Sequence, residues 1–370
     1  LLMENWADFA TLAVGTDGAL TAQWFQKSGP DAHGYEGWFS RSADGGRTWR
    51  TPARLGHEFV ALAPLSQGRT LAVWLESTRV RDPHAPRRPI RDNPLRPARD
   101  PNAPYAPSMK LMARLLSPAG TSLGEWTVDP DVCTCCQNTV TVLPGDRVFV
   151  AYRGHTPEEI RDNKFTTFDL ATSTWSPSAT LKNDGWKIPA CPVNGPAADA
   201  RDTSVAVAWF TAADGIARVQ ARTSADAGKT FASPVRIDLG RPIGRLETVM
   251  LPDHSAVILW LEMKSEANAA GLYARRLYPD GTLSAAQLLA DTTQARASGF
   301  PRAALRPDGR VLVSYTRNGE LNQVQVFSFD PRPLVRSLTL TSPAQRSSSL
   351  PAVLELCDAP LVASSTVSVH

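Results

Sequence analysis

The chain has 370 residues, with 39 Lys and Arg against 36 Asp and Glu, and therefore a formal net charge of +3 at pH 7. This near balance argues against a nucleic-acid-binding protein, which needs a concentrated excess of basic residues. A hydrophobic content of 42% excludes a disordered chain, and the lack of any apolar run of about 18 residues excludes a membrane-spanning helix.

One pattern recurs six times along the chain: a tight polar turn is followed by an alternating strand that ends in Trp or Tyr. In chain order, these aromatic residues are Trp24, Trp74, Tyr152, Trp209, Trp260 and Tyr315. The turn residues six positions earlier are Gly18, Gly68, Asp146, Thr203, His254 and Gly309. An average spacing of about 58 residues leaves room for four strands in each repeat. The sequence therefore predicts an all-β, six-bladed β-propeller of four-stranded antiparallel blades over residues 1–340.

Two segments depart from the repeat. Residues 79–107 are rich in Pro and Arg and are predicted to form a surface loop of the second blade, either simply solvated or acting as a lid or anion-binding arm. The Ser-rich tail, residues 341–370, has no repeat partner, and we expect it to close the ring or to hang free.

The chain begins with Leu1 rather than with Met, so we expect that a signal peptide has been removed and that the protein is periplasmic or secreted.

Two turns share the pattern Ser-x-Asp-x-Gly-x-Thr-aromatic, at Ser42–Trp49 and Ser224–Phe231. This pattern resembles the Asp-box, or BNR repeat, of sialidase-like propellers, and the resemblance implies that fold. The physical role of the pattern is structural: we expect Asp44 and Asp226 to accept hydrogen bonds from their own turns, and the aromatic residue to pack between sheets. Neither aspartate is therefore a catalytic candidate.

Candidate functional residues follow from the propeller geometry, because the innermost strands of all blades start at one mouth of the central channel. Counting back from the repeated aromatic residues gives these candidates in chain order: Asp8, His57, Cys133, Cys135, Cys136, Cys191, Arg245, Glu247 and Arg302. Four of the five cysteines thus fall at equivalent positions in the adjacent third and fourth blades. The charged residues 153–162 are predicted to form a solvated loop at the opposite face.

The cysteines admit three interpretations. Cys133, Cys135, Cys136 and Cys191, with His57 as a further ligand, would suit copper or zinc, because soft thiolates select these ions. Alternatively, Cys191 forms a disulfide with one cysteine of the cluster, as exported proteins allow, and a redox-active thiol also stays open. On an extended strand Cys133 and Cys135 would share a face and Cys136 would point away. We assign no role to Cys357.

The resemblance to sialidases also implies an active site. In true sialidases three arginines hold the sugar carboxylate, a Tyr activated by Glu is the nucleophile, and an Asp is the acid/base. The first arginine belongs to a Phe-Arg-Ile-Pro-like motif in blade one, but the corresponding strand here, residues 5–9, has no Arg, and no Tyr falls at a strand start that faces the channel. The catalytic candidates that remain are Arg245, Arg302, Glu247 and Asp8, which could equally form a structural ion-pair network.

Three hypotheses therefore come from the sequence. The first is an exported propeller that binds a ligand or soft metal ion through its cysteines at the channel mouth. The second is a glycoside hydrolase of exo-sialidase type that acts on an acidic sugar, and the third is a non-catalytic interaction scaffold. The expected partners are a small molecule, a glycan or a metal ion.

Overall fold

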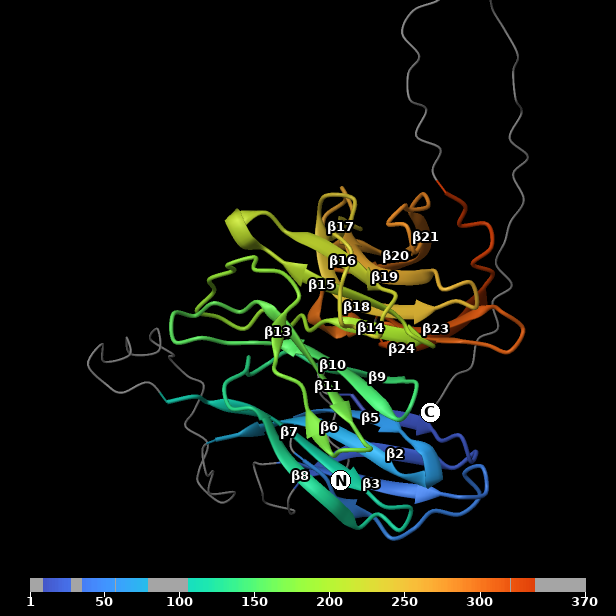
Figure 1. Cartoon of the computed structure of the whole chain (residues 1–370). Helices are drawn as coiled ribbons and strands as arrows, with labels where there is room; N and C mark the ends of the chain where they lie inside the picture. The colour runs from blue at the N-terminus through green and yellow to red at the C-terminus, as the bar shows by residue number, and fades with distance from the viewer. Residues whose placement is uncertain (1–8, 28–34, 57, 79–105, 320, 337–370) are drawn as a thin grey trace, which may run out of the picture.

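The structure is a computed structural model that describes residues 9–27, 35–56, 58–78, 106–319 and 321–336. Across these ranges the chain forms 24 β-strands, three single-turn 3-10 helices and no α-helix. The strands make six antiparallel sheets, and the chain completes each sheet before it starts the next (Figure 1). No helix in these ranges is long and apolar enough to cross a membrane.

The strands of each blade are as follows. Blade one has β1 (Thr11–Val14), β2 (Leu20–Lys27), β3 (Tyr35–Ser42) and β4 (Ala53–Arg54), and blade two has β5 (Glu58–Pro64), β6 (Thr70–Ser77), β7 (Met109–Leu116) and β8 (Ser122–Asp129). Blade three has β9 (Thr139–Leu143), β10 (Arg147–Arg153), β11 (Asn163–Asp169), β12 (Thr174–Trp175) and β13 (Ala179–Thr180), and blade four has β14 (Ala197–Arg201), β15 (Ser204–Thr211), β16 (Arg218–Ser224) and β17 (Val235–Arg236). Blade five has β18 (Pro242–Met250), β19 (Ala256–Met263), β20 (Ala269–Leu277) and β21 (Gln287–Thr293), and blade six has β22 (Arg302–Leu305), β23 (Val311–Arg317) and β24 (Gln323–Phe329).

The first strands of successive sheets line the axis of the ring. β1, β5, β9, β14, β18 and β22 contact one another in that order. Blades one and six meet where the rings of Phe9 and Phe300 lie 5.9 Å apart and the Arg302 guanidinium lies 5.0 Å from the centre of the Phe9 ring. The predicted six-bladed, all-β propeller is confirmed.

The repeated aromatic residues all lie in the second strand of their blade. Trp209 and Trp260 are fully buried, and their indole nitrogens donate hydrogen bonds to Asp184 and Glu262 at 2.9 and 2.5 Å. Burial therefore leaves no unsatisfied polar atom on these two rings, which otherwise supply large apolar contact areas between blades. The repeat in the sequence is thus a packing repeat.

The two Ser-x-Asp turns make the same hydrogen bonds. In the first turn Asp44 accepts from the backbone nitrogen and hydroxyl of Thr48 at 2.9 and 2.6 Å. In the second turn Asp226 accepts from the same groups of Thr230 at 2.8 and 2.6 Å. These bonds hold the pKa of each carboxyl at about 2, below the ordinary 3.8, because the ionised form accepts them.

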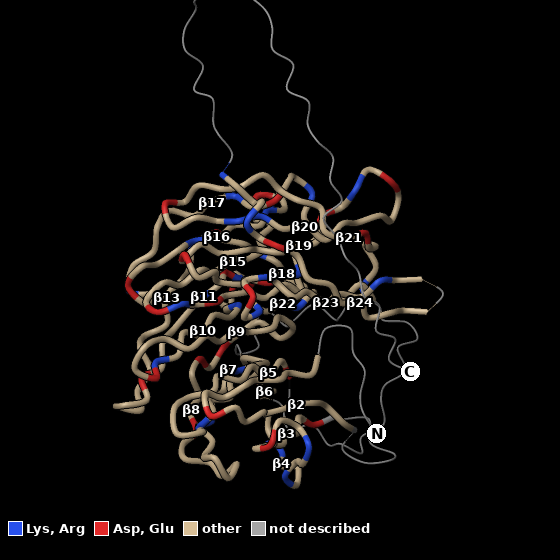
Figure 2. Tube along the Cα trace, turned by 90° about the vertical axis from the view of Figure 1, so that its right-hand side faces the viewer, with Lys and Arg blue, Asp and Glu red and all other residues tan. Residues whose placement is uncertain are grey.

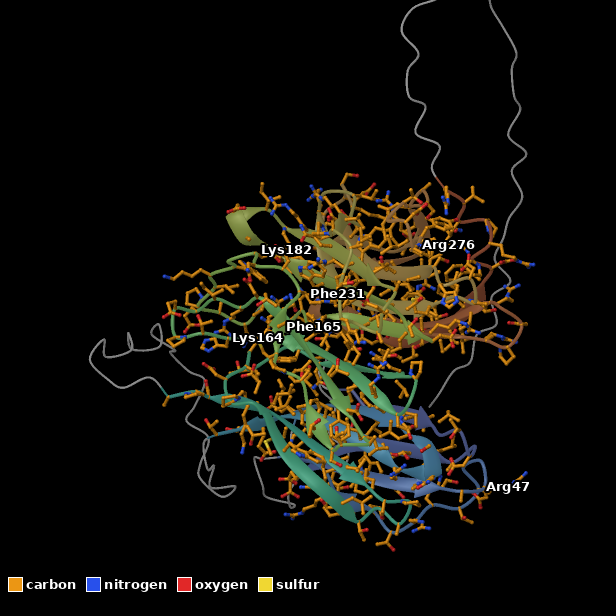
Figure 3. All side chains as sticks on the ribbon, viewed as in Figure 1. Arg47, Lys164, Phe165, Lys182, Phe231 and Arg276 are labelled. Atoms are coloured by element: carbon orange, nitrogen blue, oxygen red, sulfur yellow. A yellow bond between two sulfur atoms is a disulfide. The ribbon has the colours of Figure 1, made fainter. Side chains whose placement is uncertain are left out.

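The aromatic residues that end these turns behave differently. Phe231 packs on the preceding blade, where its ring centre lies 5.1 Å from that of Phe165, so the expected packing between sheets is confirmed there (Figure 3). Trp49 is 43% exposed and donates to the Gly46 carbonyl of its own turn instead. For Trp49 the expectation was wrong.

The two segments that depart from the repeat lie largely outside the described residues. β6 ends at Ser77 and β7 begins at Met109, so the Pro/Arg-rich segment joins two strands of blade two, although residues 79–105 lie outside the described ranges. The tail 341–370, which contains Cys357, also lies outside them. Basic and acidic positions are interspersed along the trace (Figure 2).

Candidate functional site

Two segments that precede innermost strands lie side by side at the channel mouth. Residues 133–138 lead into β9, and residues 191–196 lead into β14. The backbone nitrogen of Gly195 donates to Gln137 Oε1 at 3.1 Å, and a Cβ at position 195 would lie 1.8 Å from the Gln137 carbonyl oxygen. Only glycine permits so close an approach. This contact brings the cysteines of blades three and four together.

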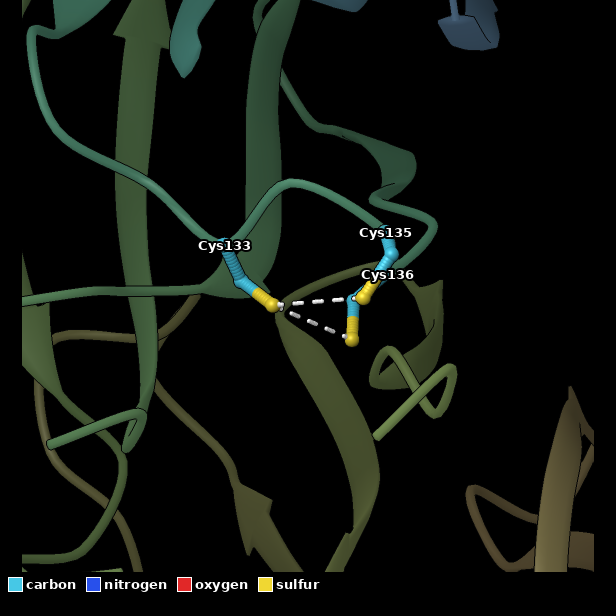
Figure 4. A group of neighbouring side chains, drawn as sticks. All are labelled: Cys133, Cys135 and Cys136. Atoms are coloured by element: carbon cyan, nitrogen blue, oxygen red, sulfur yellow. Dashed lines mark hydrogen bonds between the residues drawn. The ribbon is translucent and has the colours of Figure 1, made fainter. Parts of the chain in front are cut away.

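The sulfur atoms of these segments converge. Cys135 and Cys191 form a disulfide with their Cα atoms 5.9 Å apart. Cys133 and Cys136 are free thiols whose Sγ atoms lie 3.5 Å apart, and Cys133 Sγ lies 3.9 Å from Cys135 Sγ (Figure 4). The predicted convergence of Cys191 with the cluster is confirmed, and the disulfide is the alternative that the sequence left open. A ligand role for these cysteines stays a prediction.

The local conformation differs from the expected one. Residues 133–138 are not part of a strand, since β9 begins only at Thr139 and a turn is centred on Thr134 and Cys135. The expectation that Cys136 points away from Cys133 was therefore wrong, because the alternation of side chains applies only to extended chain. The turn brings the sulfurs of Cys133, Cys135 and Cys136 within 4.8 Å of one another.

Solvent reaches the two sulfur pairs unequally. Cys133 and Cys136 are 1% and 2% exposed, whereas Cys135 is half-buried and Cys191 is exposed. The disulfide thus lies between the solvent and the free thiols.

Two buried arginines surround the free thiols. Arg161 donates from Nη1 to Cys133 Sγ at 3.3 Å. Arg153 is 2% exposed, donates to the backbone carbonyls of Asn194 and Phe210, and lies 5.0 Å from the centre of the Trp186 ring. Both guanidiniums place positive charge beside sulfur in a region that excludes water, where charge interactions are strong.

The two free thiols differ in pKa. The hydrogen bond with Cys136 and the charges of Arg153 and Arg161 lower the pKa of Cys133 to about 5, against the opposing effect of burial. Burial and the neighbouring Cys133 raise the pKa of Cys136 well above its ordinary value. The opposite shifts favour the proton on Cys136, and we expect Cys133 to be the thiolate of the pair at neutral pH.

Residues 153–162 lie at the face where the innermost strands start, and the predicted placement at the opposite face was wrong. β10 is antiparallel to β9, and Ala151 pairs with Thr139, so the end of β10 lies beside the start of β9. Far from being solvated, Arg153 and Arg161 are buried. The antiparallel register, which the repeat already implied, would have revealed this placement.

Further polar side chains of the same loop lead outward from Arg161. Glu159 accepts from Arg161 Nη2 at 2.7 Å and contacts His155 Nε2 at 3.1 Å. The other ring nitrogen of His155 lies 2.9 Å from Asp131. Cys133 is thus linked through Arg161 to an ordered acid–histidine network.

The catalytic candidates of blades five and six are close to one another but are held by structural contacts. Glu247 is 9% exposed and pairs with Arg302 Nη1 at 3.2 Å, and burial raises its pKa. Arg245 donates from Nη1 to the carbonyls of Ala295 and Gly299 at 3.0 and 3.3 Å, and burial lowers its pKa to about 10. A catalytic role for these three residues stays a prediction.

Asp8 and His57, the remaining candidates, lie outside the described residues. Arg302 borders a cavity of about 150 Å³ at the axis, together with Phe9, Phe59, Gln137 and Asn138. Asn138 donates to the Phe59 carbonyl at 2.8 Å. The cavity therefore has both aromatic and polar walls.

Comparisons with known proteins support the fold. No protein-family model and no curated protein matches the chain. Among solved structures, the chain is similar to a protein of unknown function from Dyadobacter fermentans, with a TM-score of 0.53 and 15% identity over 88% of this chain and 96% of that one. It is also similar to the NanB sialidase from Streptococcus pneumoniae (TM-score 0.51, 11% identity, 86% of this chain and 67% of that one).

The fold is sialidase-like. A lectin has the same architecture: the Aleuria aurantia lectin in complex with alpha-methyl-L-fucoside matches with a TM-score of 0.52 and 10% identity, over 89% of this chain and 93% of that one. Since one such propeller is a sialidase and another a lectin, the shared fold does not by itself assign an activity.

Proposed function

We propose that the cysteine cluster, when fully reduced, binds one soft metal ion, Cu(I) or Zn(II), through Cys133, Cys135, Cys136 and Cys191. The observation that carries this proposal is the convergence of four sulfur atoms from two blades at one place. Thiolate sulfur is the ligand that selects these ions. His57, the fifth ligand candidate, lies outside the described residues.

The surroundings favour a metal thiolate. Metal binding requires ligands without protons, and the contacts of Cys133 lower its pKa to about 5. Arg161 and Arg153 would offset the negative charge that several thiolates add to one ion. The backbone nitrogen of Asn194 donates to Cys136 Sγ at 3.4 Å and would orient that sulfur, as partners of metal ligands commonly do.

Metal binding is tested with protein reduced under anaerobic conditions and then titrated with Cu(I) or Zn(II) against a competing chelator. We expect one ion per chain, and Cys136→Ser should lower the affinity at least about tenfold because it removes one ligand. Cys357→Ser, which removes a thiol distant in sequence, is the matched control and should bind as the original chain does. Absence of bound metal in the fully reduced protein would disprove the proposal.

An exported location is part of the same proposal. A disulfide between Cys135 and Cys191 is typical of oxidising compartments such as the periplasm. Fractionation of cells that express the gene would test the location.

The matched hydrogen bonds of the Ser42–Trp49 and Ser224–Phe231 turns support the proposal that these turns are Asp-boxes.

A glycoside hydrolase is the second candidate function. Arg302 borders the axial cavity, its side chain is 54% exposed, and it could reach an acidic sugar. Turnover of a fluorogenic sialoside that is lost in Arg302→Ala would support this activity. Inactivity on a panel of acidic glycosides would exclude it and, if no metal binds either, would leave the interaction scaffold.

A further inference from the structure

The four sulfurs form two pairs with unequal access to solvent. The buried pair, Cys133 and Cys136, has Cys-x-x-Cys spacing, and its sulfurs lie 3.5 Å apart. The outer pair is the Cys135–Cys191 disulfide, in which Cys191 is exposed. One pair is reduced and the other oxidised, and they meet where Cys133 Sγ lies 3.9 Å from Cys135 Sγ.

We propose that this cluster is a thiol–disulfide relay, in which the buried dithiol passes an electron pair to the outer disulfide. Both sulfur–sulfur distances are short enough for exchange after small side-chain rotations. Arg161 lies against Cys133 and stabilises negative charge on it, so Cys133 is the attacking sulfur. The relay requires no metal ion and does not rest on the metal-binding proposal.

The exchange balances without an external oxidant or reductant. In the first step Cys133 Sγ attacks Cys135 Sγ; the Cys133–Cys135 bond forms, the Cys135–Cys191 bond breaks, and the electron pair leaves on Cys191. In the second step Cys136, as it gives up its proton, attacks Cys133 Sγ and releases Cys135, which takes a proton. The products are a Cys133–Cys136 disulfide and two outer thiols, so two electrons have moved outward.

Molecules in solution can reach the outer sulfur pair but not the buried pair. Because Cys191 is exposed, the outer pair can exchange with a low-molecular-weight thiol or disulfide from solution. Cys133 and Cys136 are almost completely buried and can react only through the outer pair. The cluster would therefore store a reducing equivalent out of reach of solvent.

The relay is tested on metal-free protein without added reductant, in a Cys357→Ser background so that all remaining cysteines belong to the cluster. A bulky polyethylene-glycol maleimide traps any outer thiol, and mass spectrometry locates the label and the disulfides. We expect label on Cys191 together with a Cys133–Cys136 disulfide in the same molecules. Cys133→Ser should slow labelling of Cys191 at least about tenfold because it removes the attacking sulfur.

Cys136→Ser is the matched control that separates the two steps. It leaves the first exchange possible, so Cys191 should still be labelled, but the product should be a Cys133–Cys135 disulfide. Equal rates of Cys191 labelling in Cys133→Ser and in the parent protein would overturn the relay. The relay would also be overturned if Cys191 of the parent stayed unlabelled without reductant but was labelled readily after full reduction. If a variant does not fold, the parent protein is equilibrated in buffers with different ratios of reduced to oxidised glutathione, and its disulfides are located. A Cys133–Cys136 disulfide supports the relay. A Cys135–Cys191 disulfide as the only linkage at every glutathione ratio overturns it.

Discussion

Cys133 and Cys136 lie three positions apart and are both almost completely buried, yet their pKa values shift in opposite directions. The difference arises from their contacts: Cys133 has the hydrogen bond of its partner and the Arg161 guanidinium, whereas Cys136 has mainly a backbone nitrogen. Burial alone would raise both pKa values. At the scale of a residue, the hydrogen bond with Cys136 and the charges of Arg153 and Arg161 together favour the thiolate on Cys133 rather than on Cys136.

The charge on Cys133 is tested by titration of the metal-free protein through the ultraviolet absorbance of its thiolate. We expect a step near pH 5 that disappears in Cys133→Ser. Arg161→Gln should move the step to higher pH because it removes a positive charge. A single step near the ordinary thiol value of 9.0 in the parent protein would contradict the assignment.

The same shift makes stability depend on pH. The unfolded chain binds a proton at Cys133 up to about pH 9 and the native chain only up to about pH 5, so between these values the unfolded state holds more protons. The free energy of unfolding should therefore rise with pH through this window in the parent protein, and less steeply in Cys133→Ser. An equal slope in both proteins would show that Cys133 is not ionised in the native state.

The regular strands could be predicted from the sequence, whereas the irregular segments could not. The aromatic repeat located the second strand of every blade, because alternation along a strand and a fixed turn length are local rules. It could not give the conformation of residues 133–138, where a turn at Thr134 reverses the expected direction of Cys136. Such irregular segments depend on contacts between blades, here Gly195 against Gln137, that no local pattern reports.

The recurring Ser-x-Asp turn is an element whose stability can be measured. Asp226→Ala removes the hydrogen bonds to both groups of Thr230, and we expect the unfolding temperature at pH 7 to fall by roughly 2–4 °C. Because the native pKa of Asp226 is about 2 and its ordinary value is 3.8, its contribution is complete above pH 3.8 and is lost as the pH falls through 2. The difference between variant and parent should shrink accordingly in acid. Asp308→Ala, at a turn without the Ser-x-Asp pattern, is the comparison variant.

For the whole molecule, the fold and the meeting of the cysteines could be predicted together. Once six repeats close into a ring, adjacent innermost strands must start side by side, and Cys191 must come near Cys133–Cys136. What the repeat could not supply was the bonding among the sulfurs, because metal thiolates, disulfides and free thiols all suit the same positions. The structure adds that the covalent link joins two blades across a separation of 56 residues.

This link should stabilise the ring as a unit. Closing a loop of this length reduces the entropy of the unfolded chain, and we expect that removing the disulfide lowers the free energy of unfolding by about 2–4 kcal/mol. The suitable variant is Cys135→Ser combined with Cys191→Ser, since neither cysteine is then left to pair with Cys133. Denaturant unfolding of metal-free protein, followed by tryptophan fluorescence, measures the change, and Cys357→Ser is the control. If the double variant unfolds at the same denaturant concentration as the parent, blades three and four are held together by their packing, and the disulfide's role lies in its chemistry rather than in stability.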